Sequence, residues 1–261
     1  MLKHEMVARD IMTKSVRTVN HDGSLKDALT IMDREGFSQM PVMEGEKPVA
    51  LLTEPDVRRA ILQDRQDRPV AELASPLPAL VGPGTRISRV MVALQEQDSV
   101  LVVSSRDRLE GIITYWDVLE LARPYMLVKE VELLLRRVVE AAFEQKYGPD
   151  WWRHVSEDLR QRAEEEHEAD KQEGDSSPAH MLGHTSLWSL IEIFRSARPD
   201  LNGNDFKELH EIRKFRNQVA HLYILTPAEQ HELSQRCLRA GDWLQSLLPE
   251  AYPLRRGPEK R

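Results

Sequence analysis

Two Thr-x-x-Asp turns are the residues of this sequence best suited to bind a ligand. Thr53 and Asp56 form the first turn, and Thr114 and Asp117 form the second. Each turn joins a short apolar run to a helical pattern, so it matches a capping box that begins a helix. A carboxylate at a helix start could also accept hydrogen bonds from both hydroxyls of a ribose, while the N–H groups there attract phosphate. The spacing alone leaves both interpretations open.

The residues that follow the two aspartates differ. Arg58 and Arg59 come directly after the first turn, where they could offer positive charge to phosphates or simply form a solvated helix face. Leu119 and Glu120 occupy the corresponding positions after the second turn. The difference suggests that the two turns do not bind the same ligand group equally well.

A third constellation lies on a helical pattern over residues 205–225. Its apolar stripe consists of Leu209, Ile212, Val219 and Tyr223. Arg216 lies on this stripe, four residues after Ile212, and an unpaired buried charge is costly. Arg216 therefore needs a ligand phosphate, a carbonyl or a carboxylate such as Glu132 or Glu192. Asn217 and His221 are four residues apart and so share a neighbouring face.

The two turns belong to an internal repeat within residues 1–122. A constant offset of 61 residues, without a gap, aligns Ser24 with Thr85, Val42 with Val103, Leu51 with Ile112, Thr53 with Thr114, and Asp56 with Asp117. Each copy predicts the order strand, helix, strand, strand, helix. The first helix of each copy is expected to start at a Ser24 or Thr85 cap, and the two later strands are expected at 40–43 and 49–52, or at 100–103 and 111–113.

The repeat, with its strand followed by Thr-x-x-Asp, resembles the CBS domain. Two such copies, at about residues 6–62 and 68–122, resemble a Bateman module, an α/β pair of CBS domains. The resemblance implies that AMP, ADP, ATP, S-adenosylmethionine or another adenosyl ligand binds in the cleft between the copies. It assigns the ligand site to Thr53, Asp56, Arg58, Thr114 and Asp117.

The second half of the chain predicts a separate all-α bundle, over residues 123–250. Helices are expected at 125–145, 151–170, 185–197, 205–225 and 227–248, and the last begins with a Thr226–Glu229 capping box. Residues 251–261 form a basic tail that we expect to be flexible.

The helical layout of this half and the string Arg216-Asn217-Gln218-Val219-Ala220-His221 resemble HEPN domains. The resemblance implies a metal-independent endoribonuclease site at a homodimer interface. Arg216 would stabilise the charge on phosphorus, His221 would act as general acid or base at the ribose 2′-hydroxyl, and Asn217 would orient them. Some HEPN domains do not catalyse a reaction, so the alternative is a dimerisation or partner-binding module.

Composition limits these interpretations. The chain has 261 residues, of which 41% are hydrophobic and 30% charged, and its net charge of −7 argues against a bulk nucleic-acid-binding domain. We find no apolar stretch long enough to cross a membrane and no signal peptide. The single cysteine, Cys237, is expected to be a small residue in a helix, and the spacing of the nine histidines does not suggest a metal site.

We therefore expect a cytoplasmic, homodimeric regulator. Its CBS pair would sense an adenosyl ligand and bias the HEPN-like domain, which would use RNA as substrate if it is an enzyme. The helix that begins at Tyr125 would transmit the change, because only a short connection through Arg123 and Pro124 separates it from the second repeat.

Overall fold

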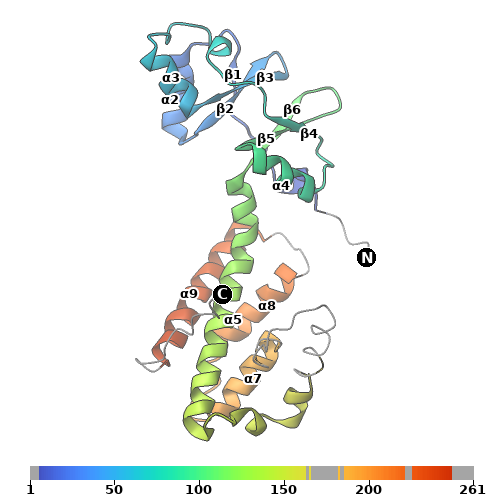
Figure 1. Ribbon diagram of the computed structural model, residues 1–261, viewed down its shortest axis with the longest axis vertical. Coiled ribbons are helices and arrows are strands. Elements are labelled where there is room, and N and C mark those ends of the chain that lie inside the picture. The colour runs from blue at the N-terminus through green and yellow to red at the C-terminus, as the bar shows by residue number, and fades with distance from the viewer. Residues whose placement is uncertain (1–5, 163–164, 166–181, 183–184, 221–224, 249–261) are drawn as a thin grey trace, which may run out of the picture. The chain divides into compact units, whose positions relative to one another are not determined.

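The computed structural model describes residues 6–162, 165, 182, 185–220 and 225–248. The chain divides into two compact units, Met1–Leu121 and Ala122–Arg261. Figure 1 shows the elements of both units, coloured by their position along the chain. Because the boundary falls inside a helix, each unit is described by itself.

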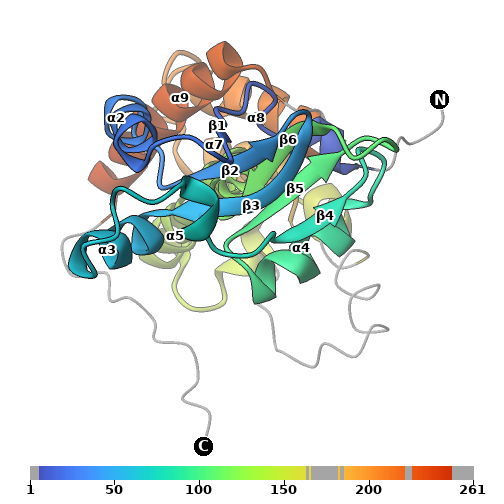
Figure 2. The ribbon, with the colours of Figure 1, turned by 90° about the horizontal axis from the view of Figure 1, so that it is seen from above.

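The first unit contains two three-stranded sheets of identical topology. One sheet has the order β1 (Val19–Asn20), β2 (Gln39–Glu44) and β3 (Lys47–Thr53); the other has the order β4 (Ala79–Val81), β5 (Ser99–Val103) and β6 (Leu109–Thr114). In each sheet the first strand is parallel to the second and the second is antiparallel to the third. Figure 2 shows the first sheet in blue and the second in green. The predicted repeat is therefore confirmed.

Helices complete each copy of the repeat. The first copy has α1 (Ala8–Ile11), α2 (Leu25–Glu35) and α3 (Glu54–Leu62), and the second has the 3-10 turn η1 (Val70–Glu72), α4 (Ile87–Glu96) and the start of α5 (Tyr115–Tyr147). Helical spacing predicts an apolar face for each of α2 and α4, and the residues of these faces that are buried are Leu25, Ala28, Met32, Val90 and Leu94. Met91, which the same spacing places on the face of α4, is 48% exposed. The helices α2 and α3 pack on the first sheet and α4 packs on the second, so each copy has its own small core. The short elements are exchanged, because Ala8 of α1 lies in the core of the second sheet and Val70 of η1 lies in the core of the first.

The gap-free alignment of the two copies is wrong in detail. The N-cap of α2 is Ser24, as expected, but the N-cap of α4 is Arg86, so these helices are offset by 62 residues. The paired residues Met40 and Leu52 correspond to Val100 and Ile113, which gives offsets of 60 and 61 for the two strands. Because strand pairing fixes which face each side chain lies on, the structural register is the correct alignment.

Thr85 is therefore not a helix cap. Its carbonyl oxygen instead accepts a hydrogen bond from the Ala8 N–H at 2.8 Å, and the backbone of Arg86 pairs with Val7. The start of the first copy thus binds the chain just before α4. This contact anchors the N-terminal segment on the second copy, an arrangement that the aligned sequence did not indicate.

The helix α5 is longer than expected. It runs without interruption from Tyr115 to Tyr147 and contains Pro124, where the sequence predicted a short connection between two helices. Proline within a helix removes one N–H donor and crowds the carbonyl four residues earlier. Here Pro124 is buried and the helix continues through it, so packing outweighs this local cost.

The described residues of the second unit contain helices and no strand. Besides α5, its elements are the 3-10 turn η2 (Trp151–His154), α7 (Leu187–Ala197), α8 (Lys207–Ala220) and α9 (Pro227–Ser246), while residues 157–162 are also helical. The helix expected over 151–170 is therefore only partly present, and most of its second half lies outside the described residues. The capping box of Thr226 and Glu229 begins α9, as predicted.

A single core joins the helices of this unit. Trp151 is 1% exposed and packs against Phe143, with 5.1 Å between ring centroids, so it is a core residue. Cys237 lies buried on α9, and burial raises the pKa of its thiol to about 12. None of the helices in the described part of the chain is both long and apolar enough to cross a membrane.

Candidate functional site

The first predicted turn forms a closed cluster around Asp56. The side chain of Thr53 caps α3, and one carboxylate oxygen of Asp56 accepts from the N–H and the hydroxyl of Thr53 at 3.0 and 2.7 Å. Ser75 donates its N–H and its hydroxyl to the same carboxylate at 3.1 and 2.8 Å. The Arg59 guanidinium adds an ion pair at 3.1 Å.

Asp56 is charged although it is buried. Its residue surface is only 1% exposed. Burial by itself would raise the pKa of Asp56, but the hydrogen bonds from Thr53 and Ser75 outweigh this effect and hold the pKa below its ordinary value. The cluster thus ties the end of β3 and the start of α3 to the segment around Ser75.

The second predicted turn forms an equivalent but more open cluster around Asp117. One carboxylate oxygen accepts from the N–H and the hydroxyl of Thr114 at 2.7 and 2.9 Å, and the other accepts from the hydroxyl of Thr13 at 2.9 Å. Asp117 is half-buried, and within the described residues it forms no ion pair.

Thr13 and Ser75 hold equivalent positions and were missed in the sequence. Thr13 forms a backbone bridge with Ile112 of β6, and Ser75 forms one with Leu51 of β3. The two hydroxyl residues are 62 apart, the offset that also relates α1 to η1. The signal is present in the strings DIMT and ELAS, but the 61-residue alignment does not superimpose their hydroxyl residues.

The cations of the first turn interact with nearby acids. Arg58, for which the sequence left open phosphate binding or a solvated helix face, lies 3.5 Å from Glu54 one helical turn earlier, and its side chain is 74% exposed. Arg59 contacts Asp56 itself. In the second copy the corresponding residues are Leu119 and Glu120, so the difference seen in the sequence persists in the structure.

Arg216 does not occupy the apolar stripe of α8. Leu209, Ile212 and Phe215 are the buried residues, and the side chain of Arg216 is 45% exposed. Leu209 and Ile212 of the expected stripe are buried, and Val219 packs partly buried against the core, but the stripe passes through Phe215 rather than Arg216. Tyr223 lies outside the described residues. Arg216 does contact one of the two carboxylates considered in the sequence: its Nε lies 3.7 Å from an oxygen of Glu132 on α5.

Glu132 is a carboxylate surrounded by three cations. Besides Arg216, it lies 3.6 Å from Lys129 and 3.9 Å from Arg136. Burial lowers the pKa of Arg136, and the charge of Glu132 only partly offsets this. A pocket of about 120 Å³ beside these groups is lined by Tyr125, Val128, Lys129, Glu132, Arg216 and Val219. Asn217 is exposed on α8, while His221 lies outside the described residues.

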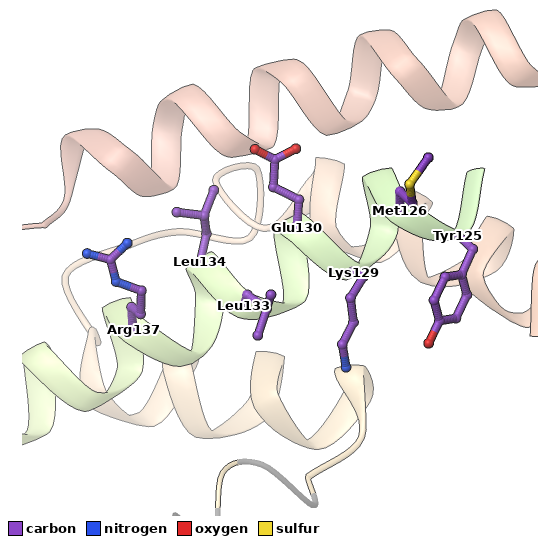
Figure 3. A pocket seen from close by; sticks show the side chains of 7 residues that line it. All are labelled: Tyr125, Met126, Lys129, Glu130, Leu133, Leu134 and Arg137. Carbon is purple, nitrogen blue, oxygen red and sulfur yellow. The ribbon is translucent and has the colours of Figure 1, made fainter. Parts of the chain in front are cut away.

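A second hollow runs along the neighbouring face of α5, and Figure 3 shows it from close by. Its volume is about 440 Å³, and Tyr125, Met126 and Leu133 leave half or more of their surface exposed there. The charged side chains beside them are Lys129, Glu130 and Arg137. The part of the chain that the structure describes holds no group of histidine, cysteine and acidic residues suited to a metal ion.

Comparison with known proteins identifies the fold of the first unit. Residues 8–63 and 70–123 match the family model of the CBS domain, so two CBS domains lie in tandem in this unit. The A-adding tRNA nucleotidyltransferase of Geobacter sulfurreducens is 30% identical over 113 residues, which are 43% of this chain. The chain spans only 13% of the length of that relative.

Solved CBS pairs show similar but distant structures. The CBS-pair protein CBSX2 from Arabidopsis thaliana is 21% identical, with 44% of this chain and 93% of that chain covered and a TM-score of 0.41. A structure of CBSX2 in complex with AMP gives 22% identity, coverage of 43% and 92%, and a TM-score of 0.39. A CBS pair solved with 5′-methylthioadenosine and S-adenosyl-L-methionine is 21% identical, with 44% of this chain and 94% of that chain covered and a TM-score of 0.41.

The Asp56 cluster predicts a pH-dependent stability. Asp56→Asn is expected to lower the free energy of unfolding at pH 7 by about 1–3 kcal/mol. The N–H and hydroxyl donors of Thr53 and Ser75 would then no longer face a charged carboxylate. Since the folded pKa is depressed, this contribution is present above the unfolded pKa of about 4 and disappears as the pH falls through the folded pKa. In urea unfolding, the difference in unfolding free energy between the wild type and Asp56→Asn should be smaller at pH 3 than at pH 7.

Glu54→Gln is the matched control. Glu54 lies two residues before Asp56 in the same first turn, but its side chain is 64% exposed. Its replacement should change stability little. An Asp56→Asn protein as stable as the wild type at pH 7 would contradict the role given to the cluster.

Proposed function

We propose that the protein is a cytoplasmic sensor whose CBS pair binds an adenosyl ligand and thereby regulates the helical unit. The observation that carries the proposal is the recurrence of a threonine, an aspartate and a second hydroxyl residue at the same strand–helix junction of both CBS copies. A carboxylate at a helix start suits a ribose diol, and the adjacent N–H groups suit phosphate. The candidate ligands are AMP, ADP, ATP and S-adenosylmethionine.

Coupling to the helical unit rests on α5. Asp117 lies in the first turn of this helix, and Glu132 lies farther along it in contact with Arg216. A ligand with a higher affinity for one arrangement of the first turn would change the population of states of the whole helix. The ligand would then act on the Arg216 region without touching it.

Ligand binding is tested by calorimetry. The wild type should bind at least one of AMP, ATP and S-adenosylmethionine, and GMP serves as the control for the base. Asp56→Ala or Asp117→Ala should weaken binding at the occupied site about tenfold or more, because a hydrogen bond to a charged group contributes about 1.5–3 kcal/mol. If no adenosyl ligand binds, the CBS pair is a structural scaffold.

We also propose that the protein is a homodimer that pairs through the hollow on α5. In an antiparallel pairing centred between Lys129 and Glu130, Met126 lies at the level of Leu133 of the second copy. Lys129 then lies at the level of Glu130 of the second copy, so apolar side chains meet apolar ones and opposite charges meet. A twofold dimer is also the commonest closed assembly.

Light scattering tests the dimer. The wild type should have about twice the chain mass of 30.1 kDa, and Met126→Glu combined with Leu133→Glu should yield monomers because like charges then face each other across the axis. Leu62→Glu is the control, since Leu62 is a 79% exposed leucine of α3. A monomeric wild type at micromolar concentration, or a dimeric double variant, would contradict the proposal.

A second candidate function is RNA cleavage by the helical unit, as its resemblance to HEPN domains implies. The supporting observation is the half-exposed Arg216 guanidinium beside Lys129 in the 120 Å³ pocket, where both cations could face a phosphate. In this reaction the ribose 2′-oxygen attacks phosphorus while His221 takes its proton. The bond to the 5′-oxygen breaks, and that oxygen takes up a proton. Glu132 competes with phosphate for Arg216, so a non-catalytic binding module is the alternative.

The nuclease assignment predicts cleavage that persists in EDTA and leaves 2′,3′-cyclic phosphate ends. His221→Ala should lower the rate about 10²–10⁴-fold by removing the general acid–base group, and Arg216→Ala should have a comparable effect by removing charge stabilisation. Lys214→Ala is the control, because Lys214 is an exposed cation of the same helix. Assays on a mixture of tRNA and mRNA, with and without ATP, AMP or S-adenosylmethionine, measure the rates.

Circular dichroism melts must accompany each rate, because a loss of fold also lowers activity. Cleavage that requires magnesium, or that survives His221→Ala unchanged, would contradict the nuclease assignment. The helical unit would then be a binding module regulated by the CBS pair.

A further inference from the structure

The two aspartate clusters differ in how much hydrogen-bonding capacity remains for a ligand. Asp56 accepts from two groups of Thr53, two groups of Ser75 and the Arg59 guanidinium. An ionised carboxylate has about four lone-pair positions, so Asp56 is saturated, and its side chain is fully buried. A ribose hydroxyl could reach it only by displacing Ser75, which also pairs with Leu51 through its backbone.

Asp117 keeps an open position. One of its oxygens accepts from two groups of Thr114, but the other accepts only from the Thr13 hydroxyl. Asp117 is also half-buried rather than enclosed. It can therefore accept a further hydrogen bond without losing an existing one.

A second, independent feature lies on the same face of the second sheet. Ser99 is 1% exposed, and its hydroxyl has no hydrogen-bond partner within the described residues. It is directly opposite Thr114 in the antiparallel ladder, so both side chains project from the same face. A buried hydroxyl without a partner is costly, and a polar ligand at the Thr114–Asp117 turn would satisfy it. Gln39 takes the equivalent place opposite Thr53.

The first turn of α5 also differs in chemistry from that of α3. Tyr115 and Trp116 precede Asp117, and Trp116 is 74% exposed, which leaves an aromatic face on which a base can stack. In α3 the same positions hold Glu54 and Pro55. The positions after Asp117 carry no cation to bind phosphate, whereas Arg58 and Arg59 follow Asp56.

We infer that Asp117, with Ser99 and Trp116, forms the ligand site of the CBS pair, and that this site takes an adenine nucleoside without recognising a phosphate. Asp117 accepts from the ribose, the Ser99 hydroxyl bonds the same ligand, and the Trp116 ring covers the base. Asp56 serves the fold and does not contact the ligand. The inference rests on the proposed sensing of adenosyl ligands and names the copy and the ligand class.

Calorimetry with adenosine on the full chain, accompanied by thermal melts, tests the assignment. Asp117→Asn should weaken adenosine binding at least tenfold and lower the melting temperature less than Asp56→Asn does, because Asp117 accepts fewer intrachain hydrogen bonds. Asp56→Asn should lower the melting temperature and leave the dissociation constant of the folded protein within about twofold. The reverse pattern, in which Asp56→Asn weakens binding and Asp117→Asn does not, would overturn the inference while the proposed sensing function stands.

A thermodynamic cycle with 2′-deoxyadenosine and 3′-deoxyadenosine tests the contact itself. If Asp117 accepts from the ribose, two changes remove the same hydrogen bond: the absence of the contacted hydroxyl from the ligand, and Asp117→Asn. The binding free energies lost through these two changes should therefore not be additive. Ser99→Ala and Trp116→Ala should each weaken adenosine binding, whereas Leu80→Ala, an exposed residue of β4, should not. Additive losses for both deoxynucleosides would rule out the ribose contact at Asp117.

The ligand class is tested by adding the phosphate. Adenosine and AMP should bind with affinities within about threefold of each other, and salt should have little effect on either. The inference would be overturned if AMP bound more than tenfold more tightly than adenosine and Arg58→Ala abolished this difference. The ligand site would then lie in the first copy. If adenosine, AMP, ATP and S-adenosylmethionine all fail to bind the wild type, the sensing function itself fails.

Discussion

The first unit depends on one carboxylate in each CBS copy that holds three chain segments together, buried at Asp56 and half-buried at Asp117. In each CBS copy an aspartate at the helix start accepts from the threonine that ends the preceding strand and from a hydroxyl residue of a distant segment. Such a carboxylate is stable only when its oxygens are hydrogen-bonded. The aspartate thereby sets the start of the helix, the end of the strand and the position of the segment that carries Ser75 or Thr13. A ligand that uses one of these carboxylates enters a network that the fold already needs.

The two equivalent clusters differ in how completely the chain coordinates the aspartate. In the first copy Arg59 and the N–H and hydroxyl of Ser75 complete the coordination of Asp56. All hydrogen-bonding positions of this carboxylate are therefore used within the fold. In the second copy Leu119 and Glu120 replace the cationic pair, and Thr13 supplies a hydroxyl only, which leaves Asp117 incompletely coordinated. Duplication of one structural motif thus leaves one aspartate fully coordinated by the chain and one with an open position, which is the basis of the ligand site inferred above.

Sequence periodicity predicted the two repeats, their strand order and the Thr-x-x-Asp turns, because these features are local. It did not predict Ser75 and Thr13, whose contact with the aspartates depends on backbone bridges to distant strands. The stripe assigned to α8 missed Phe215 for a related reason: several faces of a short helix have similar apolar content, and packing against other helices selects one of them. Pro124 was interpreted as a break because its cost is local, whereas the packing that keeps α5 intact is not.

The continuity of α5 also determines how the Arg216 region can respond. Glu132 faces Lys129, Arg136 and Arg216, so this one carboxylate is shared among three cations. Its contact with Arg216 is the only one of the three that joins α5 to α8, because Lys129 and Arg136 lie on α5 itself. At 3.7 Å and with Arg216 half-exposed, that contact is a weak ion pair that contributes about 0–1 kcal/mol. A small rotation of α5 would therefore change the availability of Arg216 more than it changes the stability of the bundle.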